Sequence, residues 1–132
     1  MITKVDHIGI AVSNIDQAVK LYTEVLGLKL KSTETLAAQK VKTAIITVGD
    51  TKIELLESTD PEGVIAKFIE SRGEGLHHIA FEVDNIEDAI GTMTGKGVSM
   101  IDTKPRKGVE NTDVAFLHPK STGKVLMELL EI

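Results

Sequence analysis

The chain has 132 residues, of which 42% are apolar, and a formal net charge of -5 at pH 7. This length is typical of one compact domain, and the absence of cysteine excludes disulfides, thiolate metal sites and thiol nucleophiles. The acidic balance and the 3% aromatic content lack the basic surface and stacking side chains of nucleic-acid-binding proteins. Asp6 and His7 interrupt the apolar N-terminal segment, and no stretch suits a signal peptide or a membrane span. We expect a cytoplasmic protein with neither nucleic-acid nor membrane partners.

The sequence contains an internal repeat, which becomes visible when His7 is aligned with His78. The segments that follow the two histidines align without a gap. The alignment extends into the region where apolar residues recur with the period of a helix. Their later parts also correspond, because the tetrapeptide Glu-Leu-Leu-Glu occurs at 54–57 and again at 128–131. The sequence therefore predicts two modules of the same design within one domain.

Each module is predicted to contain a strand, a helix and three further strands, because the apolar period changes from 2 to 3.6 and back. The elements expected in the first module are a strand at 5–12, a helix at 15–26, and strands at 28–31, 41–48 and 51–57. Those expected in the second are a strand at 76–83, a helix at 86–96, and strands near 98–101, 114–117 and 124–130. The modules extend over about 4–58 and about 75–132, and a helix at about 61–72 connects them. The whole, residues 1–132, is expected to be a single α+β domain of two pseudo-symmetric βαβββ modules.

Alternation along the strands divides their side chains between two faces. His7 and His78 belong to the face turned away from the helix of their module, where small neighbouring residues leave room for a ligand. In the last strand of each module the same alternation places Glu54 and Glu128 on that face. Two imidazoles and two carboxylates related by the repeat are therefore expected to converge.

This set of side chains suits one octahedral or five-coordinate divalent ion that acts as a Lewis acid on a carbonyl oxygen. A single histidine on a strand is more often a hydrogen-bonded core residue, and a glutamate near a strand end is usually solvated. Repetition of the whole set at matched register favours the metal site. Glu57 and Glu131, at the ends of the same two strands, are expected to face solvent.

Several longer segments carry a family resemblance that covers nearly the whole chain. They are VDHIGIAV at 5–12, VGDTKIELLE at 48–57, IAKF at 65–68, GEGLHHIAFEV at 73–83 and FLHPKS at 116–121. With these segments the chain resembles the vicinal oxygen chelate superfamily and, within it, the methylmalonyl-CoA epimerases. The resemblance implies a cup-shaped mixed sheet, a homodimer and one divalent metal ion (Co, Mn, Ni or Zn). The ligands that it implies are His7, His78, Glu128 and, at the fourth position, Glu54.

The activity implied by the resemblance interconverts the 2R and 2S forms of methylmalonyl-CoA by 1,1-proton transfer through a metal-stabilised enolate. Inversion needs acid/base groups on opposite sides of the planar enolate, and Glu128 is expected to be one of them. Thr43 stands where some of these epimerases carry a second glutamate, and its hydroxyl is a poor base. The second proton carrier is then Glu54, a metal-bound water or a water held at Thr43.

Contacts to a CoA thioester substrate are expected from basic and polar residues near the site. Lys104, Arg106, Lys107, Lys120 and Lys124 form a local basic set in an acidic protein, and the phosphates of CoA would favour it. The alternative is that these are solvated loop residues. The candidates for substrate binding are Thr43, Lys120, Arg106 and His118.

Three other functions share parts of this pattern. A glyoxalase I-type lyase has the same kind of metal site and also moves a proton, but the epimerase-like segments extend along the whole chain. A metal-free small-molecule binding protein of the same fold would be expected to lack the complete ligand set. An extradiol dioxygenase needs two histidines and one carboxylate, and the short chain with a fourth ligand argues against it.

Overall fold

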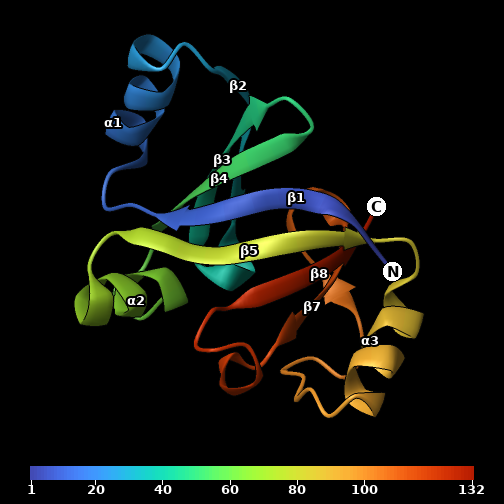
Figure 1. Ribbon diagram of the computed structural model, residues 1–132. Helices are drawn as coiled ribbons and strands as arrows, with labels where there is room; N and C mark the ends of the chain where they lie inside the picture. Colours follow the sequence, from blue (N-terminus) through green and yellow to red (C-terminus); the bar gives the residue numbers. More distant parts are fainter. The chain divides into compact units, whose positions relative to one another are not determined.

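The structure is a computed structural model that describes residues 1–132 (Figure 1). The order strand, helix and three strands occurs twice along the chain, with one helix between the two runs. The expected α+β class and the βαβββ order of each module are thereby confirmed. The chain divides into two compact units, residues 7–77 and residues 1–6 together with 78–132. No helix is both long and apolar enough to cross a membrane.

The unit of residues 7–77 is built around four strands. Its elements are β1 (Ile2–Ala11), α1 (Ile15–Lys20), β2 (Lys29–Leu36), β3 (Val41–Val48), β4 (Thr51–Ser58) and α2 (Val64–Arg72). The helix α1 continues as a π-helical turn over Leu21–Val25. Strand β3 pairs antiparallel with β2 and β4, and β1 runs parallel to β4. The first and last strands of the module are therefore neighbours.

Apolar side chains cover both faces of this sheet, but different helices pack on them. On one face Val12, Ala44 and Leu55 pack with Ile15 of α1. On the other face the fully buried Ala11 belongs to a cluster with Ile65 of α2. Ala11 is one of the small residues near His7 that were expected to leave room for a ligand, and it is instead covered by a helix.

The second unit repeats the arrangement. Its elements are β5 (Gly75–Val83), α3 (Ile86–Gly95), β6 (Arg106–Lys107), β7 (Asp113–Leu117) and β8 (Met127–Glu131). Strand β5 runs parallel to β8, and β7 pairs antiparallel with β8 and β6. Ile86 and Ile90 of α3 pack on Ala115 and Leu129 of the sheet. In each module an asparagine caps the helix, Asn14 for α1 and Asn85 for α3.

Several expected elements differ from the structure: β2 extends to Leu36 where a strand at 28–31 was expected, and β8 begins at Met127 rather than near 124. The strand near 98–101 is reduced to a single bridge between Met100 and Leu117. The ladder cannot continue, because the amides of Ile101 and Asp102 both donate to the carbonyl of Phe116. The edge strand of this module is instead the short β6, which follows Pro105.

The connecting helix begins at Val64 rather than near residue 61. The carboxylate of Asp60 accepts from the amide of Glu62, and its carbonyl accepts from Gly63. These bonds close a turn ahead of the helix and delay its first residue.

Candidate metal centre

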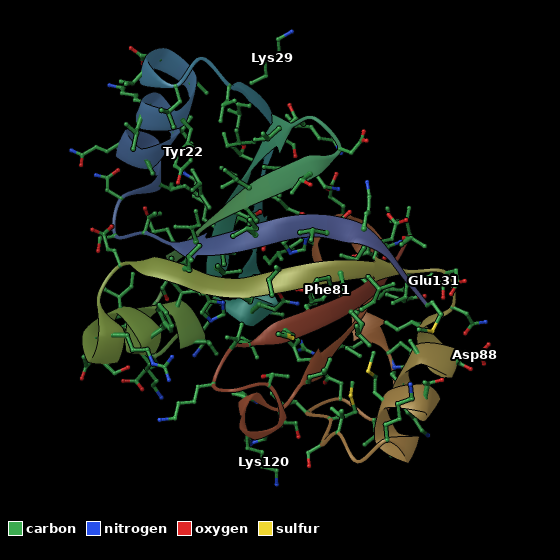
Figure 2. All side chains as sticks on the ribbon, in the orientation of Figure 1. Tyr22, Lys29, Phe81, Asp88, Lys120 and Glu131 are labelled. Atoms are coloured by element: carbon green, nitrogen blue, oxygen red, sulfur yellow. The ribbon has the colours of Figure 1, made fainter.

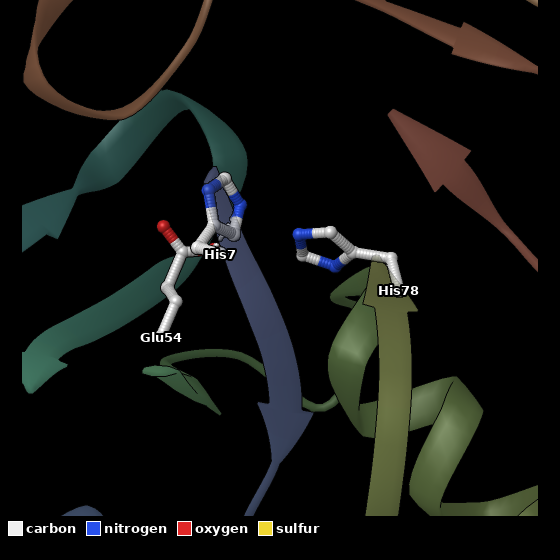
Figure 3. Close-up of side chains that lie close together, drawn as sticks. All are labelled: His7, Glu54 and His78. Carbon is white, nitrogen blue, oxygen red and sulfur yellow. Dashed lines mark ion pairs between the residues drawn. The ribbon is translucent and has the colours of Figure 1, made fainter. Parts of the chain in front are cut away.

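The first pair of predicted ligands lies within the unit of residues 7–77. His7 on β1 and Glu54 on β4 point toward one another, with 3.8 Å between Nε2 and Oε1 (Figure 3). Both side chains are buried, with 10% and 5% of their surface exposed. Gly9, directly opposite Glu54 on the neighbouring strand, has no side chain, so the carboxylate can lean toward His7.

The second pair lies within the other unit and has the same design. His78 on β5 and Glu128 on β8 are buried, with 3.2 Å between Nε2 and Oε1. The residue opposite Glu128 is the small Ala80. In both modules the histidine stands two positions before the small residue that faces the glutamate. The repeat seen in the sequence is therefore also a repeat of side-chain geometry.

The chemistry of these side chains fits a divalent cation. Each pair offers an imidazole nitrogen and a carboxylate oxygen, which are ligands of Mn, Co, Ni and Zn. A buried carboxylate is costly unless a positive charge or hydrogen bonds compensate it, and an ion would supply that charge. His7, Glu54 and His78 could hold a metal ion. Which metal would be preferred depends on geometry and availability rather than on these residue types.

Phe116 borders the second pair and Asp102 holds the backbone amide of Phe116, and sequence reasoning missed both. Phe116 on β7 is the direct partner of Glu128 in the sheet, and its ring lies edge-on to that of His78 with 5.8 Å between centroids. The carboxylate of Asp102 accepts from the amide of Phe116 and from Nε of Arg106. Asp102 lies in an irregular segment, so no periodic signal could have identified it.

Thr43 is fully buried on β3. Its hydroxyl donates to the carbonyl of Glu34 on β2 at 3.4 Å, and its direct partner on β4 is Leu56. A threonine hydroxyl is a poor base at neutral pH, and this one already donates its proton to a backbone carbonyl. The absence of a catalytic role for the Thr43 hydroxyl stays a prediction.

His118 and Lys120 lie in the turn before β8. Nδ1 of His118 accepts from the amide of Lys120 at 3.1 Å and caps the short turn Pro119–Ser121. Lys120 is exposed and points away from the strands (Figure 2). His118 therefore has a structural role in this turn, and contact of either side chain with substrate stays a prediction.

Glu57 and Glu131 do not face solvent as expected. Oε1 of Glu57 accepts from the amide of Ile15 at 2.6 Å, and Oε1 of Glu131 accepts from the amide of Ile86 at 2.7 Å. These amides open α1 and α3, where helix N-termini have unsatisfied donors and favour negative charge. Strand alternation predicts the face of the sheet on which a side chain lies. It does not predict whether the N-terminus of a helix packs against that face.

Comparison with known proteins agrees with this fold. The model of the Glyoxalase/Bleomycin resistance protein/Dioxygenase superfamily matches residues 6–116. Mitochondrial methylmalonyl-CoA epimerase of Dictyostelium discoideum is 36% identical over 131 residues, 98% of this chain and 79% of that protein. The solved structure of a hypothetical protein from Bacillus halodurans C-125 is 48% identical, with a TM-score of 0.96 and coverage of 98% of this chain and 94% of the other.

A solved structure of methylmalonyl-CoA epimerase, in complex with methylmalonyl-CoA and NH4+, is also similar. It is 33% identical, with a TM-score of 0.95 and coverage of 99% of this chain and 95% of that chain. The chain belongs to the Glyoxalase/Bleomycin resistance protein/Dioxygenase superfamily, and the resemblance noted in the sequence is confirmed.

Proposed function

We propose that this protein is an isomerase that epimerises methylmalonyl-CoA at the carbon between the thioester and the free carboxylate. The observation that carries the proposal is the pair of buried His–Glu sets at equal positions of the two modules. Similarity over nearly the full length to proteins named as methylmalonyl-CoA epimerases supports the choice of substrate.

The proposed site takes its ligands from equivalent positions of the two modules. Its ligands to one divalent ion are His7, Glu54, His78 and Glu128. When bound, the ion would polarise the thioester and carboxylate oxygens and so stabilise the negative charge that develops on the substrate. The four side chains orient the substrate, and their burial keeps water away from the reacting carbon.

The proton transfers are proposed to use the two glutamates. One carboxylate removes the α-proton, so that the C–H bond breaks and its electron pair delocalises into the thioester carbonyl. The other glutamic acid then donates its proton to the opposite face of the carbon. Glu128 is one of these groups, and the other is assigned to Glu54, which holds the matching position beside the histidine of the first module.

Proton exchange in deuterated water tests the activity directly. We expect proton NMR of methylmalonyl-CoA with the protein and a divalent salt to show loss of the α-proton, and a chelator to abolish it. Absence of exchange with the ion demonstrably bound would contradict an epimerase. Hemithioacetals of glutathione would then be the next substrates, because a glyoxalase I-type lyase has the same kind of site.

We further propose that the protein is a cytoplasmic homodimer, in line with the resemblance. Light scattering coupled to gel filtration measures the mass directly. A mass near twice the 14.3 kDa of the chain would agree with the dimer, and a mass near that of one chain would contradict it.

A further inference from the structure

The guanidinium of Arg106 is held in place on two sides. Its Nε donates to Oδ1 of Asp102 at 3.0 Å. Its central carbon lies 5.3 Å from the centroid of the Phe116 ring. The Asp102 carboxylate is itself fixed, because its other oxygen accepts from the amide of Phe116 at 2.9 Å. Such a preorganised fork loses less side-chain entropy on binding a ligand than a mobile lysine would.

Phe116 places this guanidinium next to the second His–Glu pair. The ring contacts Arg106 and also lies edge-on to His78. In the sheet Phe116 is directly opposite Glu128, and directly opposed residues project from the same face. Arg106 is therefore one aromatic ring away from two of the proposed ligands, on the face where they lie.

The charge of Arg106 can still act on a ligand. Its side chain is 50% exposed, whereas the Asp102 side chain is 15% exposed. Asp102 bonds only the Nε edge, and its charge is shared with the Phe116 amide. The two terminal nitrogens carry further donors, and a guanidinium edge of this kind matches a carboxylate.

We propose that Arg106 binds the free carboxylate of the substrate and thereby selects acyl-CoA thioesters that carry a second acid group. This inference rests on the proposed function for the identity of the substrate. A positive charge at the carboxylate also favours α-proton removal, because otherwise a second negative charge would develop beside the first. Arg106 is thus assigned to substrate recognition, with Asp102 and Phe116 as its positioning residues.

A comparison of two ligands separates the carboxylate from the rest of the substrate. Propionyl-CoA has the same CoA portion and acyl chain as racemic methylmalonyl-CoA but lacks the free carboxylate. We would measure both affinities by calorimetry, with the same manganese salt, for the unaltered protein, Arg106→Met and Lys107→Met. Methionine keeps an unbranched side chain that can lie on Phe116. Lys107 is the matched control, because it is the neighbouring cation and pairs with Asp113 instead.

Arg106→Met should weaken the binding of methylmalonyl-CoA about tenfold or more and leave propionyl-CoA within about twofold. Lys107→Met should change neither affinity by more than about twofold, since exposed ion pairs contribute little. Equal weakening of both ligands by Arg106→Met would show a contact with the phosphates of CoA and overturn the proposal. Unchanged affinities for both ligands would overturn it as well.

Binding does not require turnover, so the two proposals can fail separately. Loss of carboxylate selectivity in Arg106→Met, without α-proton exchange in the unaltered protein, would refute the epimerase and retain the role of Arg106. Normal α-proton exchange in the unaltered protein, with no change of carboxylate selectivity in Arg106→Met, would retain the epimerase and refute the role of Arg106.

Discussion

Each candidate glutamate reaches its histidine because the residue opposite it is small. Gly9 faces Glu54, and Ala80 faces Glu128. Cross-strand neighbours have their Cβ atoms close together, so a larger side chain at either position would compete with the carboxylate for space. The small residues are as much a part of the site as its polar side chains.

Removing the charge of either glutamate tests the two-base mechanism. We expect Glu128→Gln and Glu54→Gln each to slow α-proton exchange at least about a hundredfold, because an amide cannot accept the proton. Proton NMR in deuterated water measures the rate, and elemental analysis shows whether the ion is still bound.

Glu57→Gln is the matched control for these variants. It lies on the same strand as Glu54 but bonds the start of α1, and its amide oxygen can still accept that bond. Its exchange rate should stay close to that of the unaltered protein. Wild-type exchange in both Glu128→Gln and Glu54→Gln would show that neither glutamate carries the proton.

The four candidate ligands could be predicted at this scale because two signals agreed. Strand alternation predicted the face of the sheet on which each ligand lies. The internal repeat identified the equivalent residue in the other module. Asp102 and Phe116 could not be found in this way. Their contacts with Arg106 depend on how an irregular segment passes over a strand, and no period describes that path.

Among the elements, the strand that carries each glutamate ligand also anchors a helix. Glu57 and Glu131 end β4 and β8 and accept from the first amides of α1 and α3. Figure 2 labels Glu131 at the end of its strand and Asp88 on the helix α3. Within each module, one segment therefore holds both a candidate ligand and a helix N-terminus.

Removal of either anchor should lower stability. We expect Glu57→Ala and Glu131→Ala each to reduce the free energy of unfolding by about 1–2 kcal/mol, because a partly buried amide loses its acceptor. Urea denaturation measures the change, and Glu57→Gln should lose much less. Alanine variants as stable as the unaltered protein would show that water replaces the carboxylates at no cost.

Most elements were predictable because their signals are local. The alternation and the helical stripe identified β1, β3, β4, β5 and α3 close to their observed bounds, and the helix expected at 15–26 corresponds to α1 together with its π-helical turn. The strand expected near 98–101 failed because apolar residues there pack under α3 without forming a ladder. A run of apolar residues indicates that the segment is buried. To form a strand, the segment also needs a neighbouring strand that pairs with it in register.

At the scale of the whole molecule, the proposed site requires ligands from both modules. An ion that binds only the folded protein stabilises it, by about 2.7 kcal/mol at one hundred times its Kd. We expect a manganese or cobalt salt to raise the Tm by several degrees, as measured by calorimetry.

Ligand variants in each module test whether the site is shared. His7→Ala and His78→Ala should each abolish most of the metal-dependent rise in Tm. Lys67→Ala, on the exposed surface of α2, is a control that should keep it. A rise that disappears in only one of the two histidine variants would mean that one module binds the ion alone.

By itself the sequence determined the two modules, the order of their elements and the four candidate ligands. These follow from the repeat and from strand alternation, which are properties of short segments. Only the tertiary structure decided that Ala11 lies under α2, that Glu57 and Glu131 anchor helices, and that Arg106 lies on Phe116. Each of these contacts joins segments that are distant in the chain, and their meeting is set by packing rather than by any local pattern.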